Sequence, residues 1–93
     1  MRRRYRSQAG ILHDVLEVLL REGPLNATRI AQLANLPYDR LRLLLDRLIE
    51  LGLVELVEDD EGRRLYRITQ EGLEAYQKLH AAKEILEKLG YRL

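Results

Sequence analysis

The sequence predicts a mainly α-helical domain of the α+β class, with one small β-hairpin and a long C-terminal helix. Apolar residues recur at helical spacing through the first half, and two short apolar runs flank an acidic, glycine-containing segment. After these runs, a further helical pattern continues nearly to the end of the chain. With 93 residues, the chain is long enough for one domain but not for two. The core of such a chain is thin, so apolar surface shared with a second copy would stabilise it.

The first helix is predicted to begin after Ser7, a residue type that caps helices, and to end at Gly23-Pro24. Its apolar face recurs at helical period and contains Ile11, Leu12, Val15, Leu16, Leu19 and Leu20. The opposite, solvated side is expected to hold His13, Asp14, Glu17 and Arg21.

Two shorter helices follow. Asn26 is expected to cap the second helix, which buries Ile30, Leu33 and Ala34. Pro37 lies at or near the start of the third helix, about Tyr38–Leu51, and Gly52 ends it. The buried stripe of the third helix is predicted to be Leu41, Leu44, Leu45 and Leu48.

A β-hairpin is predicted from the runs 53–57 and 64–68, because an acidic turn containing Gly62 separates them. Thr69 then caps a helix that extends to about Leu89. A helix-turn-helix followed directly by a hairpin is the plan of a winged helix. We therefore expect a basic arm at 1–7, a winged helix-turn-helix domain at 8–69 and a dimerisation helix at 70–93.

Charge is distributed unevenly along the chain, although the net charge is only +1. Residues 1–47 hold nine arginines and five acidic residues, whereas residues 48–93 hold seven basic and ten acidic residues. Arginine suits phosphate and base edges, so the asymmetry indicates nucleic-acid binding. The chain contains no cysteine and no apolar run of membrane-spanning length, so we expect a cytoplasmic, nucleoid-associated protein. The high fraction of charged residues favours a thermophilic source.

Two segments carry a resemblance to known regulators. The segment from Ile30-Ala31 to Tyr38, with Leu41, Leu48 and 52–54, resembles the helix-turn-helix of archaeal winged-helix regulators. The run Leu65–Leu73, with its Tyr-x-Ile-Thr-x-x-Gly motif, is similar to the strand-to-helix junction of these and of multiple-antibiotic-resistance-type and phenolic-acid-type regulators. The resemblance covers 7–89 and is strongest to small archaeal chromatin or regulator proteins. It implies a DNA-binding dimer whose C-terminal helices pair as an antiparallel coiled coil.

The third helix is expected to lie in the major groove of double-stranded DNA. Arg42 is the best candidate for a base contact, and Arg40 and Arg47 suit phosphates. Asp39 either accepts a hydrogen bond from cytosine or holds Arg42 in place. The full set of predicted DNA-binding residues is Tyr38, Asp39, Arg40, Arg42, Leu43, Arg47, Thr28, Arg29, Arg63, Arg64, Arg2, Arg3, Arg4 and Arg6.

Two parts of this surface leave alternatives open. The basic arm either enters a minor groove or lies on phosphates, or it is a solubilising tail. The turn of the hairpin carries four consecutive acids, Glu58 to Glu61, which disfavours the usual contact of a wing with DNA. We expect this tip to point away from DNA or to engage a protein, while Arg63 and Arg64 approach DNA from its flank.

The C-terminal helix carries an apolar seam at spacings of four and three residues, typical of a coiled coil. The residues predicted to dimerise are Ala75, Leu79, Ala82, Ile85, Leu86 and Leu89. Leu73 and Tyr76 are expected to complete the core of the monomer. The alternative is that the stripe packs onto its own domain, but a helix of this length exceeds what a small core needs.

We find no catalytic constellation and predict neither enzyme activity nor a cofactor or metal. His13 and Glu17 lie one helical turn apart, a spacing that metal ligands use, but a solvated pair is the simpler interpretation. The favoured function is a sequence-specific transcription regulator. Its alternatives are an architectural DNA-binding protein with little sequence preference and a winged helix that binds proteins. A small-molecule effector is left open.

Overall fold

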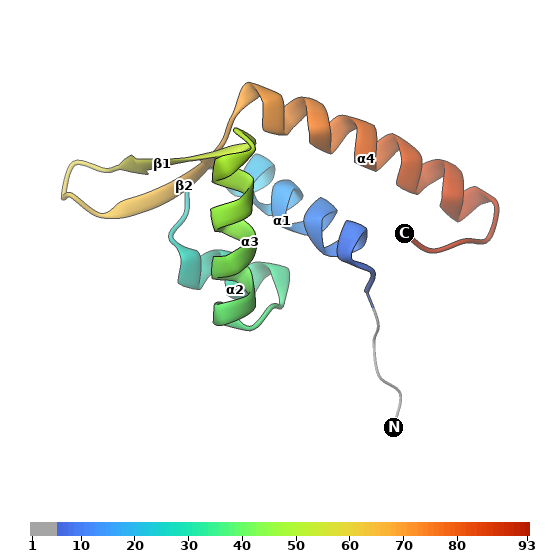
Figure 1. Ribbon diagram of the computed structural model, residues 1–93, viewed down its shortest axis with the longest axis horizontal. Helices are drawn as coiled ribbons and strands as arrows, with labels where there is room; N and C mark the ends of the chain where they lie inside the picture. The colour runs from blue at the N-terminus through green and yellow to red at the C-terminus, as the bar shows by residue number, and fades with distance from the viewer. Residues whose placement is uncertain (1–5) are drawn as a thin grey trace.

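A computed structural model describes residues 6–93, which form four helices and a two-stranded antiparallel sheet (Figure 1). The elements follow in the predicted order: α1 (Gln8–Glu22), α2 (Ala27–Ala34), α3 (Tyr38–Glu50), β1 (Val54–Glu58), β2 (Arg64–Ile68) and α4 (Gln70–Lys88). The predicted mainly α, α+β fold class is confirmed. Among the described residues, no helix combines the length and the apolar character that a membrane span requires.

Three helices begin at the side chains that the sequence predicted. Ser7 accepts a hydrogen bond from the Gly10 amide at 2.9 Å. Asn26 does the same for the amide of Arg29 at 2.8 Å. Each cap satisfies a backbone donor that the first helical turn leaves free. The α3 helix begins differently, at Pro37, with no side-chain cap.

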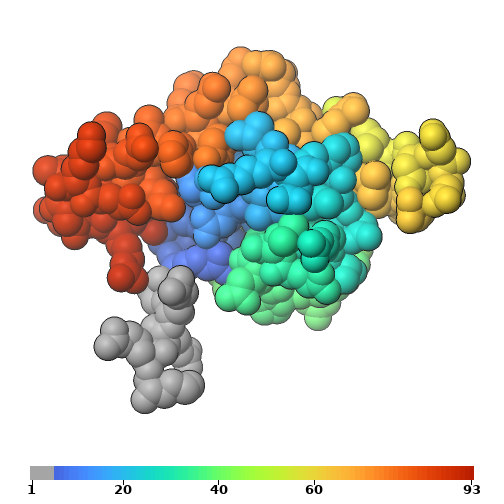
Figure 2. All heavy atoms as spheres, turned by 180° about the vertical axis from the view of Figure 1, so that it is seen from behind, coloured from blue at the N-terminus to red at the C-terminus, as the bar shows by residue number. Residues whose placement is uncertain are grey.

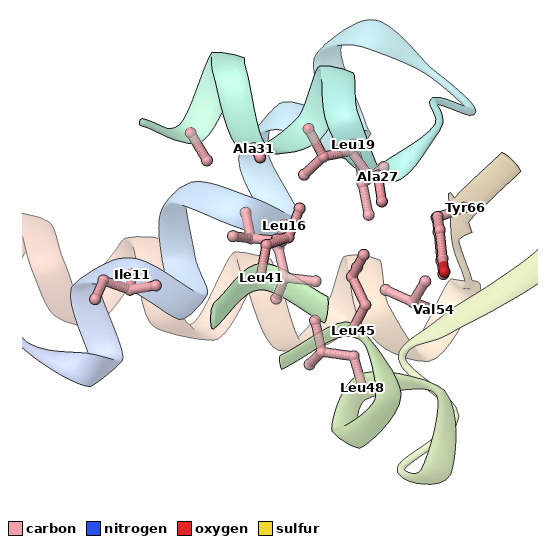
Figure 3. Packing of buried hydrophobic residues seen from close by; sticks show 13 residues of the cluster. Ile11, Leu16, Leu19, Ala27, Ala31, Leu41, Leu45, Leu48, Val54 and Tyr66 are labelled. Atoms are coloured by element: carbon pink, nitrogen blue, oxygen red, sulfur yellow. The ribbon is translucent and has the colours of Figure 1, made fainter. Parts of the chain in front are cut away.

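The core lies where α1, α2 and α3 meet the base of the hairpin (Figure 3). Val15, Leu16 and Ile30 have no exposed surface, and neither have Leu41 and Leu45. Burying a leucine-sized side chain contributes roughly 1.5–3 kcal/mol. These side chains fix α3 against the rest of the domain through one face, so its other face remains available.

The hairpin pairs Val54 with Ile68 at its base and Glu58 with Arg64 near its tip. An isolated bridge between Leu25 and Tyr66 extends this sheet, and the sequence did not predict it. The Leu25 amide donates to the Tyr66 carbonyl at 3.1 Å, and the Tyr66 amide donates back to the Leu25 carbonyl at 2.7 Å. This exchange ties the loop before α2 to the hairpin, whose tip projects beyond the rest of the domain (Figure 2).

A small polar junction joins the hairpin to α4. The Thr69 side chain accepts from the Gly72 amide at 3.0 Å and donates to the Gly52 carbonyl at 2.6 Å. Gly72 is buried directly against the Leu53 carbonyl, where a Cβ would overlap that oxygen. The Thr-x-x-Gly part of the sequence motif is therefore the point at which the end of α3 and the start of α4 are fixed to each other.

Several burial predictions are wrong. Leu33 is 38% exposed because the short α2 buries only the stripe formed by Ala27, Ile30, Ala31 and Ala34. Leu20, in the last turn of α1, is 40% exposed, and Leu44 is only half-buried. His13 is 1% exposed rather than solvated, because α4 covers that side of α1.

Part of the predicted dimerisation seam belongs to the monomer. Ala75 and Leu79 pack against the domain's own core, as does Tyr76. The seam residues in the last two turns of α4 stay largely outside it, since Ile85 is 59% and Leu89 is 66% exposed. The alternative of a helix that packs onto its own domain thus holds for the first half of α4, which lies along α1 (Figure 1).

Candidate nucleic-acid interface

The outward face of α3 is as predicted. The inward residues Leu41, Leu45 and Leu48 are buried. Up to Arg47, the exposed residues of the helix are Tyr38, Asp39, Arg40, Arg42, Leu43, Asp46 and Arg47. Helical geometry places this second set on one continuous side of α3.

Tyr38 and Arg42 form a pair one turn apart at the start of α3. Arg42 Nη1 donates to the Tyr38 hydroxyl at 3.1 Å, and its guanidinium carbon lies 6.0 Å from the centre of the tyrosine ring. The hydrogen bond to Tyr38 raises the pKa of Arg42, so the guanidinium stays charged. Next to this pair, Leu43 is 70% exposed. The first two turns of α3 therefore offer a cation, a hydroxyl and an apolar side chain to a partner.

The start of α2 offers a second group of polar atoms. Thr28 and Arg29 are exposed there, as predicted. The guanidinium of Arg29 donates only to the neutral side chain of Gln32, at 3.3 Å, among the residues described. Its charge is thus uncompensated at a helix N-terminus, a position that favours anions.

Apart from Arg92 near the C-terminus, which is exposed and takes part in no ion pair within residues 6–93, the described arginines divide into two groups. Arg6, Arg21, Arg63 and Arg67 each lie within 4.0 Å of a carboxylate oxygen. Within residues 6–93, no ion pair involves a second group, which consists of Arg29, Arg40, Arg42, Arg47 and Arg64. All five of these are exposed on the helix-turn-helix and the hairpin.

The one described arginine of the basic arm is anchored. Arg6 forms an ion pair with Asp14 at 3.0 Å and donates to the Asn35 carbonyl at 2.8 Å. Asn35 ends α2 in the left-handed conformation, with φ of 57°. Arg6 therefore ties the start of α1 to the turn between α2 and α3, a role that the sequence did not reveal. Arg2, Arg3 and Arg4 lie outside the described residues.

The tip of the hairpin is organised around one of its acids. Asp59 Oδ1 accepts from the amides of Glu61 and Arg63, both at 2.9 Å. The Arg63 side chain binds Asp59 at 2.7 Å and Glu61 at 2.9 Å. The backbone hydrogen bond from Arg63 lowers the pKa of Asp59, and the guanidinium adds to this effect. Two of the four acids are thus used to build the turn, and Arg63 is committed to them.

On β2, Arg67 forms an ion pair, whereas Arg64 forms none within residues 6–93. Arg67 donates twice to Glu55 Oε2 across the strands, at 2.9 and 2.8 Å. Arg64 stands opposite Glu58 in the register, but no ion pair involves it within residues 6–93. Of the two wing arginines predicted to approach DNA, Arg63 is bound to the acids of the tip, whereas Arg64 forms no ion pair in the described part of the chain.

The comparisons with known proteins come from sequence and from structure. A family model described as a winged helix-turn-helix matches residues 5–87. No curated protein matches the sequence. A solved structure of Sso10a-2, described as a DNA-binding protein from Sulfolobus solfataricus, is similar with a TM-score of 0.79 and 25% identity, covering 90% of this chain and 85% of that one.

Longer bacterial regulators share the fold. The PcaV transcriptional regulator from Streptomyces coelicolor is similar with a TM-score of 0.70 and 30% identity over 75% of this chain and 51% of its own. A MarR family protein from Bacillus stearothermophilus has a TM-score of 0.70 at 24% identity, over 76% of this chain and 50% of its own, which is evidence for the fold alone. The chain thus spans about half the length of these structures.

Proposed function

Because this chain belongs to the winged helix-turn-helix family, we propose that it is a transcription regulator that binds double-stranded DNA with α3 in the major groove. The observation that carries the proposal is the set of five exposed arginines on the helix-turn-helix and the hairpin that form no ion pair within residues 6–93. Affinity for DNA comes largely from neutralised phosphates. When these guanidiniums bind phosphates, no ion pair within residues 6–93 has to break.

The distribution of charge along α3 supports insertion of its N-terminal half into the major groove. The helix contains three arginines and three acids, so it is neutral as a whole. Asp46 and Glu50 lie in its C-terminal half, where they would repel phosphates, whereas Arg40 and Arg42 lie near its start. We therefore place base contacts at the first two turns, with Arg42 on guanine and Leu43 against a thymine methyl group.

Phosphate contacts follow from the positions of the remaining free arginines. Arg29 at the start of α2 flanks the proposed reading surface, as do Arg40 and Arg47 on α3, and Arg64 extends it along the hairpin. Arg63 and the acids it binds are assigned to the architecture of the tip and not to DNA. Such contacts position a protein on the duplex, while the base contacts supply specificity.

We infer that the active form is a dimer that pairs through the last two turns of α4. Ala82, Ile85 and Leu89 leave an apolar stripe exposed there, and the half-buried Leu86 adjoins it. A second copy is the occupant that two-fold symmetry favours, because the same stripe is present on both chains. Two copies would present two α3 helices to successive half-sites. Such a protein acts by binding, and we place it with the nucleoid in the cytoplasm.

A second candidate is DNA binding with little sequence preference. The likeness to Sso10a-2, described as a DNA-binding protein and not as a transcriptional regulator, extends over most of both chains, whereas the longer regulators are matched over half their length. The ratio of affinities for a selected operator and for random DNA separates the two. A large ratio supports a specific regulator, and a ratio near one supports an architectural role.

The experiment that tests the proposal compares charge-removing variants by fluorescence anisotropy of a labelled duplex. Arg42→Ala is expected to weaken binding by about 1–3 kcal/mol, roughly 5- to 150-fold. Lys78→Ala removes the same charge from α4 and is expected to leave affinity unchanged. Equal loss in both variants would contradict a role for α3, and no binding by the wild-type chain would favour a protein-binding winged helix.

A further inference from the structure

A polar cluster lies between α1 and α4, away from the proposed DNA surface. It contains His13, Glu17, Tyr76 and His80. One ligand atom from each of His13, Glu17 and His80 lies within 4.8 Å of the other two. His13 is buried, while Glu17 and His80 are half-buried, so the cluster is open on one side. The sequence predicted only a solvated His13–Glu17 pair, because His80 arrives from a helix 67 residues away.

The hydrogen bonds around His13 determine which of its nitrogens is free to bind. Nδ1 lies 3.0 Å from Asp14 Oδ1, and a carboxylate only accepts, so Nδ1 donates. In the neutral ring, Nε2 therefore presents a lone pair. That lone pair faces His80 Nδ1 at 3.0 Å. A carboxylate that orients a histidine in this way is the usual second partner of a metal-binding imidazole.

Asp14 is itself held in place. Burial would raise the pKa of Asp14, but hydrogen bonds from His13 and Arg6 together outweigh it and lower the pKa. Arg6 provides its bond at 3.0 Å and also binds the end of α2. The ring of His13 is thus oriented by a chain of contacts that continues to the turn before α3.

Glu17 and His80 have supporting partners as well. The Tyr76 hydroxyl donates to Glu17 Oε2 at 2.7 Å. Burial and this bond raise the pKa of Tyr76 to about 12, so the hydroxyl stays a donor. His80 Nε2 lies 3.5 Å from Glu84 Oε2 on the outer side. His13 and Glu17 are thus each joined by a hydrogen bond to a second group, and Glu84 lies beside the outer nitrogen of His80.

We propose that His13 Nε2, His80 Nδ1 and the Glu17 carboxylate bind a divalent transition-metal ion, with zinc the best fit. Imidazole nitrogens with one carboxylate suit zinc and its neighbours, whereas magnesium and calcium prefer oxygen ligands. Three protein ligands leave a fourth position for water. Bonds of about 2.0–2.1 Å in tetrahedral geometry place neighbouring ligand atoms roughly 3.3 Å apart. The two imidazole nitrogens are 3.0 Å apart and the Glu17 carboxylate lies within 4.8 Å of both, so all three ligand atoms must shift to reach this spacing.

Metal binding requires one proton to move. Nδ1 of His80 donates to His13 Nε2 in the metal-free cluster, so this proton must leave before Nδ1 can ligate. Transfer through solvent to Nε2 of the same ring produces the other neutral tautomer, whose N–H then faces Glu84. The net charge of both rings is unchanged.

The test is a zinc titration of the full chain by competition with a chelating dye. The wild-type chain is expected to bind one zinc ion per chain, and Glu17→Gln and His80→Gln are expected to weaken binding at least about 10-fold. Glu22→Gln makes the same change at an exposed site on α1 and is expected to leave affinity unchanged. Equal affinity in all four proteins, or no zinc binding by the wild-type chain, would overturn the proposal.

A spectroscopic measurement separates loss of a ligand from loss of the fold. The wild-type chain with Co²⁺ is expected to show the intense visible absorption of a four-coordinate ion, and His80→Gln to lose it while its circular dichroism is retained. Asp14→Asn, which removes only the orienting group, is expected to weaken zinc binding roughly 10- to 100-fold without changing the stoichiometry. A wild-type cobalt spectrum identical to that of the ion in buffer would overturn the site.

Discussion

Gly72→Ala tests whether the junction between the hairpin and α4 is fixed as the structure indicates. In an exposed helical position, alanine is more stable than glycine by about 0.5–1 kcal/mol. At Gly72, however, the new methyl group would overlap the Leu53 carbonyl oxygen and lie 2.7 Å from the Ile68 side chain. The Leu53 carbonyl also accepts the Thr69 amide at 3.1 Å, so it cannot move alone.

Gly72→Ala is therefore expected to lower the stability of the protein, although alanine has the higher helix propensity. Forcing a methyl group into a well-packed contact costs about 1–3 kcal/mol, and more where backbone must move. We expect the larger end here, so that Gly72→Ala destabilises the protein by about 2 kcal/mol after the propensity gain is subtracted. For a domain of this size, the melting temperature would fall by roughly 8–16 °C.

Thermal and urea unfolding followed by circular dichroism measure this change at one fixed protein concentration, because a dimer's stability depends on concentration. Ala81→Gly, an exposed site on the same helix, is the matched control and should lose only about 1 kcal/mol. A Gly72→Ala protein as stable as the wild type, or more stable, would refute the proposed contact at Leu53.

Three further predictions concern the core, the hairpin and the dimer. Leu45→Ala removes a side chain with no exposed surface and is expected to cost about 2–5 kcal/mol, measured by urea unfolding; a cost below 1 kcal/mol would contradict the packing. The pKa of Asp59 is lowered in the folded protein, so the contribution of the tip to stability is present at neutral pH and is lost as the pH falls through that lowered pKa. Amide NMR shifts of Glu61 and Arg63 should report a midpoint below the ordinary value of about 3.9, and an ordinary midpoint would argue against the network. Ile85→Glu with Leu89→Glu should produce a folded monomer in analytical ultracentrifugation, and a persistent dimer would place the interface elsewhere.

Local signals in the sequence predicted the elements well. Ser7, Asn26 and Thr69 are each followed three residues later by the amide that they cap, so these helix starts depend only on neighbouring residues. The outward face of α3 was predicted for a related reason. Four of the five leucines in α3 repeat at helical spacing, and the side opposite the stripe that they form must face solvent.

Features that depend on distant residues could not be predicted. His13 shares its helix face with charged neighbours, and only the packing of α4 explains its burial. Arg6 seemed to belong to a free basic arm, but its partners are Asp14 and a carbonyl 29 residues away. From the sequence, Asp59 was predicted to be one of four acids at the tip. Aspartate side chains in turns often accept a hydrogen bond from the amide two residues later, as Asp59 does from Glu61. The role of Asp59 therefore depends on neighbouring residues and can be predicted from the sequence.

Five exposed arginines on the helix-turn-helix and the hairpin form no ion pair within residues 6–93, and the salt dependence of binding measures whether they contact DNA. Four of them, Arg29, Arg40, Arg47 and Arg64, are assigned to phosphates, which makes roughly eight contacts for a dimer and a log–log slope of about −7. The measurement is anisotropy of a labelled random duplex with the wild-type chain from about 50 to 200 mM salt. A steep slope near this value supports the account. A flat slope, or no binding at the lowest salt, would contradict it.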